Sequence, residues 1–160
     1  MERGGLSMGL ADGGTRSRQL DEIAEALPQR TSALSRLFLT RTSICVSRTE
    51  VGVLRILSNG PRRITEIAFI ERVTQPAITL LVNRLAERGW VQRVADPSDG
   101  RAVLVSLTSA GAAAFAQLRA EYRAMLHAEM AMLRDEDVDT LARSVEILDE
   151  LIERLTERDA

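Results

Sequence analysis

The sequence predicts a mainly α-helical fold with one small β-hairpin, on three observations. Apolar residues recur at helical spacing over most of the 160 residues, and only 3% of the residues are aromatic, so the core is aliphatic. In the middle of the chain, short helical patterns precede two β-branched segments that flank a Pro/Asp/Gly turn. Longer helical patterns stand on both sides of this middle region, which indicates one small domain with an added oligomerisation element.

The N-terminal part divides into an arm and a helix. Residues 1–17 are glycine-rich and aperiodic, and we expect a disordered arm there. A helical pattern then runs from Arg18 to about Arg41, and Pro28 should kink or split it. The apolar positions of this pattern are Leu20, Ile23, Leu27, Leu34, Leu37 and Phe38.

Three short helices follow. Ser47 and Glu50 form a capping-box pattern before a helix at roughly residues 49–58, which the Asn-Gly-Pro sequence at 59–61 ends. Its inward-facing residues are expected to be Val51, Leu54 and Leu57. Residues 65–71 form the second helix. Thr74 can cap the third helix, which runs to Arg88 and ends at Gly89, a natural position for a left-handed residue.

Two short strands complete the middle region. Residues 90–94 and 101–107 alternate like strands, and residues 96–100 have the composition of a turn. Three short helices followed by a hairpin make a winged helix-turn-helix, which is a DNA-binding arrangement. We therefore assign residues 47–108 to a DNA-binding domain.

The C-terminal part contains two longer helices. Thr108 can cap an alanine-rich helix at roughly residues 109–133, and an acidic segment at 135–139 starts the last helix. Apolar residues then recur at alternating steps of three and four, which is typical of a helix that packs along another helix. That partner helix is either in the same chain or in a second copy. We assign residues 18–46 and 109–160 to a helical dimerisation region, with an expected interface of Leu20, Ile23, Leu141, Val145, Leu148, Ile152 and Leu155; Val138 begins the same repeat.

The third short helix has two different faces. On a helical wheel Ile78, Leu81, Val82 and Leu85 share the core face. Gln75, Pro76, Thr79 and Asn83 lie opposite, flanked by Ala77, Leu80 and Arg84. Glutamine and asparagine can pair bidentately with adenine in the major groove, although most amphipathic helices also have an ordinary polar face.

Arg101 stands at the end of the hairpin turn. An arginine beside a glycine on a slender hairpin can enter a minor groove, which is electronegative in A·T tracts. The alternative is a surface charge paired with Asp99, or Asp99 can hold Arg84 or a wing arginine while Arg101 points outward. Arg62, Arg63 and Thr65 can reach phosphates near the start of the second helix. The residues expected to contact DNA are Thr65, Thr74, Gln75, Pro76, Ala77, Thr79, Asn83, Arg84, Ser98, Asp99 and Arg101.

The charge distribution favours an anionic partner for the middle region. The chain has a net charge of −2, but residues 48–101 carry nine arginines against six acids, a net of +3. Residues 119–160 carry six arginines against twelve acids, a net of −6. A basic segment held by an acidic scaffold suits local binding to a polyanion.

The sequence contains no pattern typical of a membrane protein, a metal site or an enzyme. There is no apolar run of 18 residues and no apolar signal region, so we expect a cytoplasmic protein without a membrane span. The single cysteine, Cys45, and the single histidine, His127, form no metal site or nucleophile pair, and no phosphate loop occurs. We therefore expect neither an enzyme nor a cofactor, and we interpret Cys45 as a small buried hydrophobic residue.

The segment VTQPAITLLVNRLAERGWVQRV followed by DPSDGRAVLVSLTSAG resembles the MarR family of bacterial transcription regulators. The family pattern is a recognition helix, then L-x-x-x-G-h-h-x-R, a D-x-x-D-x-R wing and h-h-h-x-L-T-x-x-G. It falls here on Leu85, Gly89, Arg93, Asp96, Asp99, Arg101, Leu107, Thr108 and Gly111. The motifs cover residues 73–111, and the flanking helices fit the family order over roughly 18–158.

The resemblance implies a homodimer on double-stranded DNA with a pseudo-palindromic sequence, and possible release by a small aromatic or phenolic effector. It also implies major-groove contact by the helix that starts at Thr74 and minor-groove contact by Arg101. Leu80 departs from the family, because many relatives carry an arginine there that contacts phosphate. The alternative function is a winged-helix module that binds protein without DNA.

Overall fold

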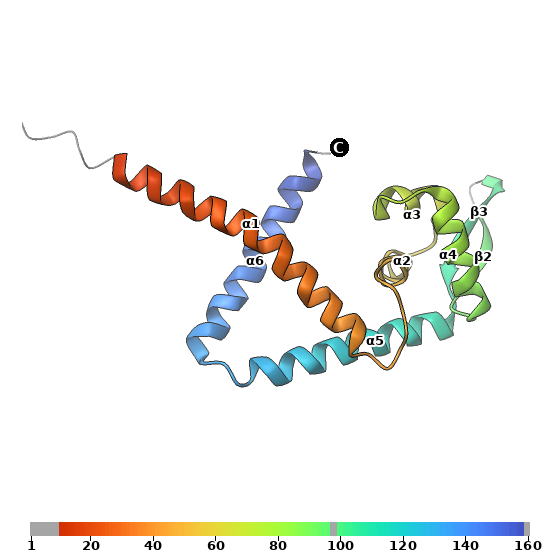
Figure 1. The fold of residues 1–160 in the computed structure, drawn as a ribbon. Helices are drawn as coiled ribbons and strands as arrows, with labels where there is room; N and C mark the ends of the chain where they lie inside the picture. The colour runs from red at the N-terminus through yellow and green to blue at the C-terminus, as the bar shows by residue number, and fades with distance from the viewer. Residues whose placement is uncertain (1–9, 97–98, 159–160) are drawn as a thin grey trace, which may run out of the picture. The chain divides into compact units, whose positions relative to one another are not determined.

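The computed structural model describes residues 10–96 and 99–158 and is mainly α-helical, as the sequence predicted (Figure 1). Its helices are α1 (Leu10–Thr40), α2 (Arg48–Ser58), α3 (Ile64–Glu71), α4 (Gln75–Glu87), α5 (Ser109–Met130) and α6 (Asp135–Glu157), and its strands are β1 (Arg62–Arg63), β2 (Val91–Asp96) and β3 (Asp99–Leu107). The chain divides within α5 into two compact units, Met1–Phe115 and Ala116–Ala160, and each is described by itself.

Local signals place the ends of the short helices. Ser47 and Glu50 form the predicted capping box, because the Glu50 N–H donates to Ser47 Oγ at 3.2 Å and the Ser47 N–H donates to Glu50 Oε2 at 2.7 Å. Gly60 ends α2 with φ 123°, and Gly89 ends α4 with φ 72°. Both values lie in the left-handed region that glycine adopts without a steric penalty, so these two helix ends were predictable from sequence.

The strands form one three-stranded antiparallel sheet in the described residues, in the order β1-β3-β2. The hairpin of β2 and β3 confirms the predicted wing. β1 was not predicted, because two adjacent arginines show no alternation of apolar and polar residues. Arg62 and Arg63 are strand residues only because Val105 and Leu104 of β3 lie opposite them.

The first unit has an aliphatic core. α2, α3 and α4 each turn one face inward against the sheet and the start of α5, and this arrangement is the predicted winged helix-turn-helix. Val51, which was expected to face inward, is only partly buried, whereas Val53 and Ile56 are buried. The buried residues of this core are Val53, Leu54, Ile56, Leu57, Ile67, Ala68, Ile78, Leu81, Val82, Leu85, Val91, Val105 and Phe115.

Helix α1 corrects the predicted extent of the arm and shows that Pro28 does not split the helix. It begins at Leu10, within the part expected to be a disordered arm, and residues 1–9 of that arm lie outside the described residues. Extending a helix adds one hydrogen bond per residue, and only nucleation is costly, so the glycines before Thr15 do not stop it. The helix also continues through Pro28 without a break. A proline removes one backbone donor, and here the neighbouring turns persist around it.

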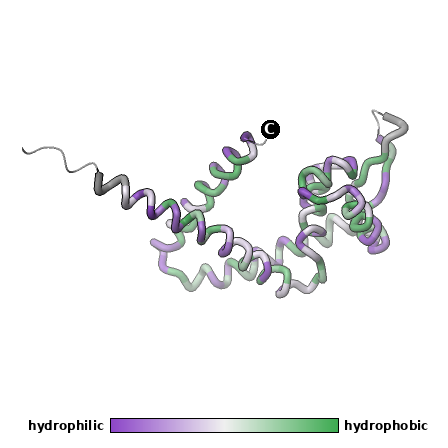
Figure 2. Tube along the Cα trace, turned by 45° about the horizontal axis from the view of Figure 1, so that its top comes forward, coloured by the Kyte–Doolittle hydropathy of each residue, from purple (hydrophilic) through white to green (hydrophobic). Residues whose placement is uncertain are grey.

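The second unit contains the rest of α5 and all of α6. α5 ends at Met130, a little before the predicted end at Leu133. Three acids, Asp135, Glu136 and Asp137, stand in the first turn of α6, where the positive end of the helix dipole favours them. Figure 2 shows hydrophobic and hydrophilic residues alternating along α6. No residue of α6 is buried, so its predicted apolar repeat is exposed in this chain.

Candidate nucleic-acid interface

Helix α4 presents the face that the wheel predicted. Its core face is buried, and Ile78, Val82 and Leu85 are fully covered. The opposite face is exposed, except that Thr79 is half-buried. The exposed residues of this face are Gln75, Pro76, Ala77, Leu80, Asn83 and Arg84. The division of the helix into two faces is therefore confirmed, while the DNA contacts of the outer face stay a prediction.

The N-terminal ends of α3 and α4 lie at the surface. Thr74 occupies the N-cap position of α4, but its side chain makes no capping hydrogen bond, so the prediction that Thr74 caps through its hydroxyl was wrong. Its carbonyl accepts from Ile78 instead, which starts the helical hydrogen bonds. Thr65 is exposed in the first turn of α3, which Glu66 closes by accepting from the Arg63 N–H at 2.7 Å. Free backbone N–H groups at such ends favour anions.

Two polar side chains of the outer face already form hydrogen bonds within the protein. The Thr79 hydroxyl donates to the Gln75 carbonyl at 2.9 Å. Asn83 Oδ1 accepts from Arg93 Nη2 at 2.8 Å, which joins α4 to β2. Asn83 therefore has less of its amide to offer a base than the sequence predicted, and Gln75 is the better candidate for bidentate pairing with adenine.

The outer end of β2, next to the hairpin turn, is held by an ion pair that the sequence did not predict. Asp96 is buried, and its Oδ2 accepts from Arg63 Nη2 at 2.7 Å. Arg63 is thus tied to β2, and its contact with phosphate stays a prediction. The contact considered for Asp99 with Arg84 or a wing arginine stays a prediction.

The wing tip itself is described only in outline. Asp99 and Arg101 belong to β3, and Asp99 lies opposite Asp96 in the hairpin register. Ser98, a predicted DNA contact, lies outside the described residues. The DNA contacts of the wing therefore stay predictions.

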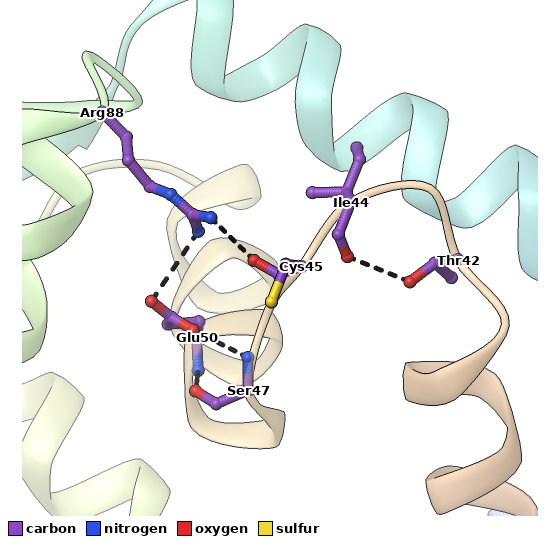
Figure 3. Close-up of polar contacts among 6 residues, drawn as sticks. All are labelled: Thr42, Ile44, Cys45, Ser47, Glu50 and Arg88. Atoms are coloured by element: carbon purple, nitrogen blue, oxygen red, sulfur yellow. Dashed lines mark hydrogen bonds and ion pairs between the residues drawn. The ribbon is translucent and has the colours of Figure 1, made fainter.

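Arg88 connects the end of α4 to the segment before α2 (Figure 3). Its Nη2 donates to the Cys45 carbonyl at 2.7 Å, and its Nη1 lies 3.9 Å from Glu50 Oε1. The guanidinium also stands over the Trp90 ring, 4.4 Å from the ring centre. Sequence reasoning missed this junction because its members are far apart along the chain. It orients α4 against the helix that carries the capping box.

Cys45 contradicts its prediction, because it is exposed rather than buried. Residues 45–47 form no regular secondary structure, and Val46 is the buried residue of this segment. The residues on either side of Val46, Cys45 and Ser47, are exposed. The backbone of Cys45, rather than its thiol, makes the contact with Arg88.

Thr108 and Gly111, the last two residues of the sequence motif, connect the wing to α5 through hydrogen bonds. Thr108 Oγ1 donates to the Gly89 carbonyl at 2.6 Å and accepts from the Gly111 N–H at 3.0 Å, which confirms the predicted cap of α5. The Thr108 N–H donates to the Trp90 carbonyl at 3.0 Å. These bonds join the end of α4, the start of β2 and the start of α5 at one point. The wing is therefore positioned relative to α4 by hydrogen bonds of the Thr108 hydroxyl and backbone N–H.

A buried carboxylate supports the packing of α3 on α2. Burial raises the pKa of Glu71, and Arg55, whose Nη2 lies 3.8 Å from Glu71 Oε1, opposes that rise. A methyl group at Gly52 would collide with the Glu71 carboxylate, so glycine leaves room for it.

Replacing Arg72 by glycine is expected to stabilise the first unit. Arg72 ends α3 with φ 53°, where a residue with a side chain costs about 1–2 kcal/mol. Glycine removes that cost but loses more chain entropy on folding, so the expected net gain is about 0.5–1 kcal/mol. Urea denaturation measures it. Arg72→Ala is the matched control, because it loses the arginine side chain and keeps the strain; equal stability of the two variants would contradict the explanation.

The described residues give no sign of a metal centre or a membrane segment. No group of three or more His, Cys, Asp or Glu side chains in this part of the chain is arranged to hold a metal ion. Among the same residues, no helix is both long and apolar enough to cross a membrane.

This chain is similar to a family model and to known proteins. The model of the MarR family matches residues 46–103. An uncharacterized HTH-type transcriptional regulator of Mycobacterium leprae (strain TN) is 32% identical over 109 residues, which are 68% of this chain and 76% of that protein. One of Bacillus subtilis (strain 168) is 39% identical over 67 residues, 41% of this chain and 48% of that protein, so the chain spans about half of that relative's length.

Solved structures agree in fold. The structure of the Multiple Antibiotic Resistance Repressor, MarR, is similar with a TM-score of 0.68 and 27% identity. The similarity covers 79% of this chain and 94% of that one, so it extends beyond the winged helix-turn-helix into the flanking helices.

Proposed function

This chain belongs to the MarR family, and we propose that it is a sequence-specific DNA-binding regulator of transcription. The observation that carries the proposal is α4, whose inner face is buried while its outer face is exposed next to a hairpin. Hydrogen bonds of the Thr108 hydroxyl and backbone N–H set the position of the hairpin relative to α4. The net charge of +3 over residues 48–101 supplies attraction to phosphates.

The proposed contacts follow from this geometry. The N-terminal half of α4 enters the major groove, with Gln75 available for adenine. Thr65 and the exposed first turns of α3 and α4 meet phosphates. Arg101, near the start of β3, reaches an adjacent minor groove.

The proposed regulator is a homodimer on a pseudo-palindromic operator. Apolar residues of α1 and α6 are exposed in the single chain, among them Leu20, Ile23, Val145 and Ile152. A second copy would cover them and place two copies of α4 on successive turns of the duplex. We further propose repression, in keeping with the solved relative named a repressor, and release by a small aromatic or phenolic effector. Such a role belongs to the cytoplasm.

Selection of duplexes from a random pool with the purified protein tests this function directly. We expect enrichment of a two-fold related sequence. The logarithm of its binding constant should fall linearly with the logarithm of salt concentration, by about 0.9 for each phosphate neutralised. A protein-binding module would enrich no sequence and show no such slope, and that result would overturn the proposal.

Arg101→Ala is expected to weaken binding to the selected duplex by about 1–3 kcal/mol without changing the free energy of unfolding. The reason is the loss of the minor-groove arginine from a hairpin whose strands β2 and β3 stay paired along their length. Arg143→Ala is the matched control, because it removes the same charge from an exposed position on α6. Equal affinities of the two variants in a fluorescence anisotropy titration would remove the wing contact.

A further inference from the structure

Apolar side chains dominate the part of α4 that is proposed to face the bases. Gln75, Pro76, Thr79 and Leu80 line a shallow surface depression, and its exposed lining is almost entirely apolar. Leu80 is 66% exposed. A single exposed leucine on a protein surface needs no explanation. Here, however, it lies beside Thr79 and one helical turn after Pro76, on the outer face of α4.

The polar atoms at this place are largely committed within the protein. The Thr79 hydroxyl donates its proton to the Gln75 carbonyl, and Asn83 Oδ1 accepts from Arg93. The Gln75 amide is the polar group that remains for a base in the depression. The rest of the surface consists of the Pro76 ring, the Thr79 methyl group and the Leu80 side chain.

The depression is also small. Four residues from two turns of one helix line it, whereas a stable protein interface buries about 800 Å² on each partner. It adjoins Arg84, which is exposed on the same helix. A small apolar depression beside an exposed arginine suits a polyanion that presents a single methyl group better than it suits a second protein.

On the basis of the proposed DNA binding, we infer that Pro76, Thr79 and Leu80 form a contact for the C5 methyl group of thymine. Thymine is the only base that presents a methyl group in the major groove, next to its O4 acceptor. Removing one methyl group from water changes a binding constant by about fourfold. The operator therefore carries thymine at the base pairs that face Leu80, and this apolar contact replaces the phosphate contact that an arginine there would make.

Replacing thymidine by deoxyuridine, one position at a time, tests the inference in duplexes obtained by selection. The change removes only the methyl group. The wild-type protein should lose about fourfold in affinity at one or two positions in each half-site. Leu80→Ala should bind the thymidine duplex more weakly by a similar factor and should no longer distinguish deoxyuridine from thymidine at those positions. Its salt slope should equal that of the wild type, because no phosphate contact is lost.

Phe69→Ala is the matched control, because Phe69 is 82% exposed on α3 and lies outside the depression. That variant should keep the wild-type response to deoxyuridine. Equal wild-type affinity for the two duplexes, or an unchanged deoxyuridine response in Leu80→Ala, would overturn the inference while DNA binding itself persists. Failure of the proposed function is distinguishable, because then no duplex is selected. Thermal unfolding of Leu80→Ala checks that the exposed substitution leaves the fold intact.

Discussion

A methyl group added at Gly111 is expected to destabilise the first unit by about 2–4 kcal/mol. Gly111 is buried in the first turn of α5, and a Cβ atom there would overlap the Trp90 carbonyl oxygen. Its φ is not positive, unlike that of Gly89, so the requirement is for space rather than for backbone freedom. Gly111→Ala measured by urea denaturation gives the cost.

The Trp90 backbone cannot move aside without breaking other bonds. The Trp90 N–H donates to the Leu85 carbonyl at 2.9 Å, and its carbonyl accepts from the Thr108 N–H at 3.0 Å. No side-chain rotation relieves the overlap, because the clashing atom belongs to the main chain. The expected cost therefore exceeds that of an ordinary overpacked side chain that can change rotamer.

Gly14→Ala in α1 is the matched control for this substitution. An added Cβ at Gly14 meets nothing within 4 Å, and alanine is the better helix former by about 1 kcal/mol. That variant should be as stable as the wild type or slightly more so. A Gly111→Ala variant within about 0.5 kcal/mol of the wild type would contradict the structural explanation of the last glycine of the motif.

The parts of the fold that were predictable depend on neighbours in sequence. The capping box joins Ser47 to Glu50, and the core face of α4 repeats within four residues, so each signal is complete inside a short window. Thr108 and Gly111 belong to the same class, since three residues separate the cap from the N–H that it accepts. A sequence shows such relations directly.

The parts that were not predictable depend on distant partners. β1 exists because Arg62 pairs with Val105, and Asp96 is buried because Arg63 reaches it. The position of Cys45 follows from the burial of Val46 and from the Arg88 contact with its backbone. A single sequence records none of these pairings, and hydropathy alone predicted the opposite for Cys45.

The same distinction applies to the candidate site. The helical wheel predicted the outer face of α4. It could not predict the hydrogen bond from Arg93 to Asn83, because that bond forms only when the hairpin packs beside α4. The sequence shows that Pro76 and Leu80 make this face partly apolar. It does not show that the Thr79 hydroxyl donates to the Gln75 carbonyl, which leaves the Thr79 methyl group as part of the apolar surface.

Two glutamates on the apolar stripe of α6 are expected to abolish dimerisation. The double variant Val145→Glu and Ile152→Glu changes residues that are 56% and 59% exposed in the single chain, so its own fold should persist. In a homodimer these positions would be covered, and burying two unpaired carboxylates costs several kcal/mol. Sedimentation should show monomers where the wild type sediments as a dimer.

Binding to the selected duplex should fall by about 100-fold or more in this variant. Two winged helices held together bind the second half-site at a high effective concentration, and a monomer loses that advantage without losing any DNA contact. The salt slope should fall toward half of its wild-type value, because one α4 and one wing engage the duplex instead of two. This halving distinguishes lost dimerisation from a damaged DNA surface.

The control places the same change of charge on the other side of the helix. Arg143→Ala with Arg154→Ala also lowers the net charge by two, and both arginines are exposed. Their ion pairs with Glu146 and Glu150 are surface pairs, worth about 0–1 kcal/mol each, so dimers and operator affinity should persist. If the glutamate variant also sediments as a dimer, the stripe on α6 packs elsewhere, and the homodimer must be built on other residues.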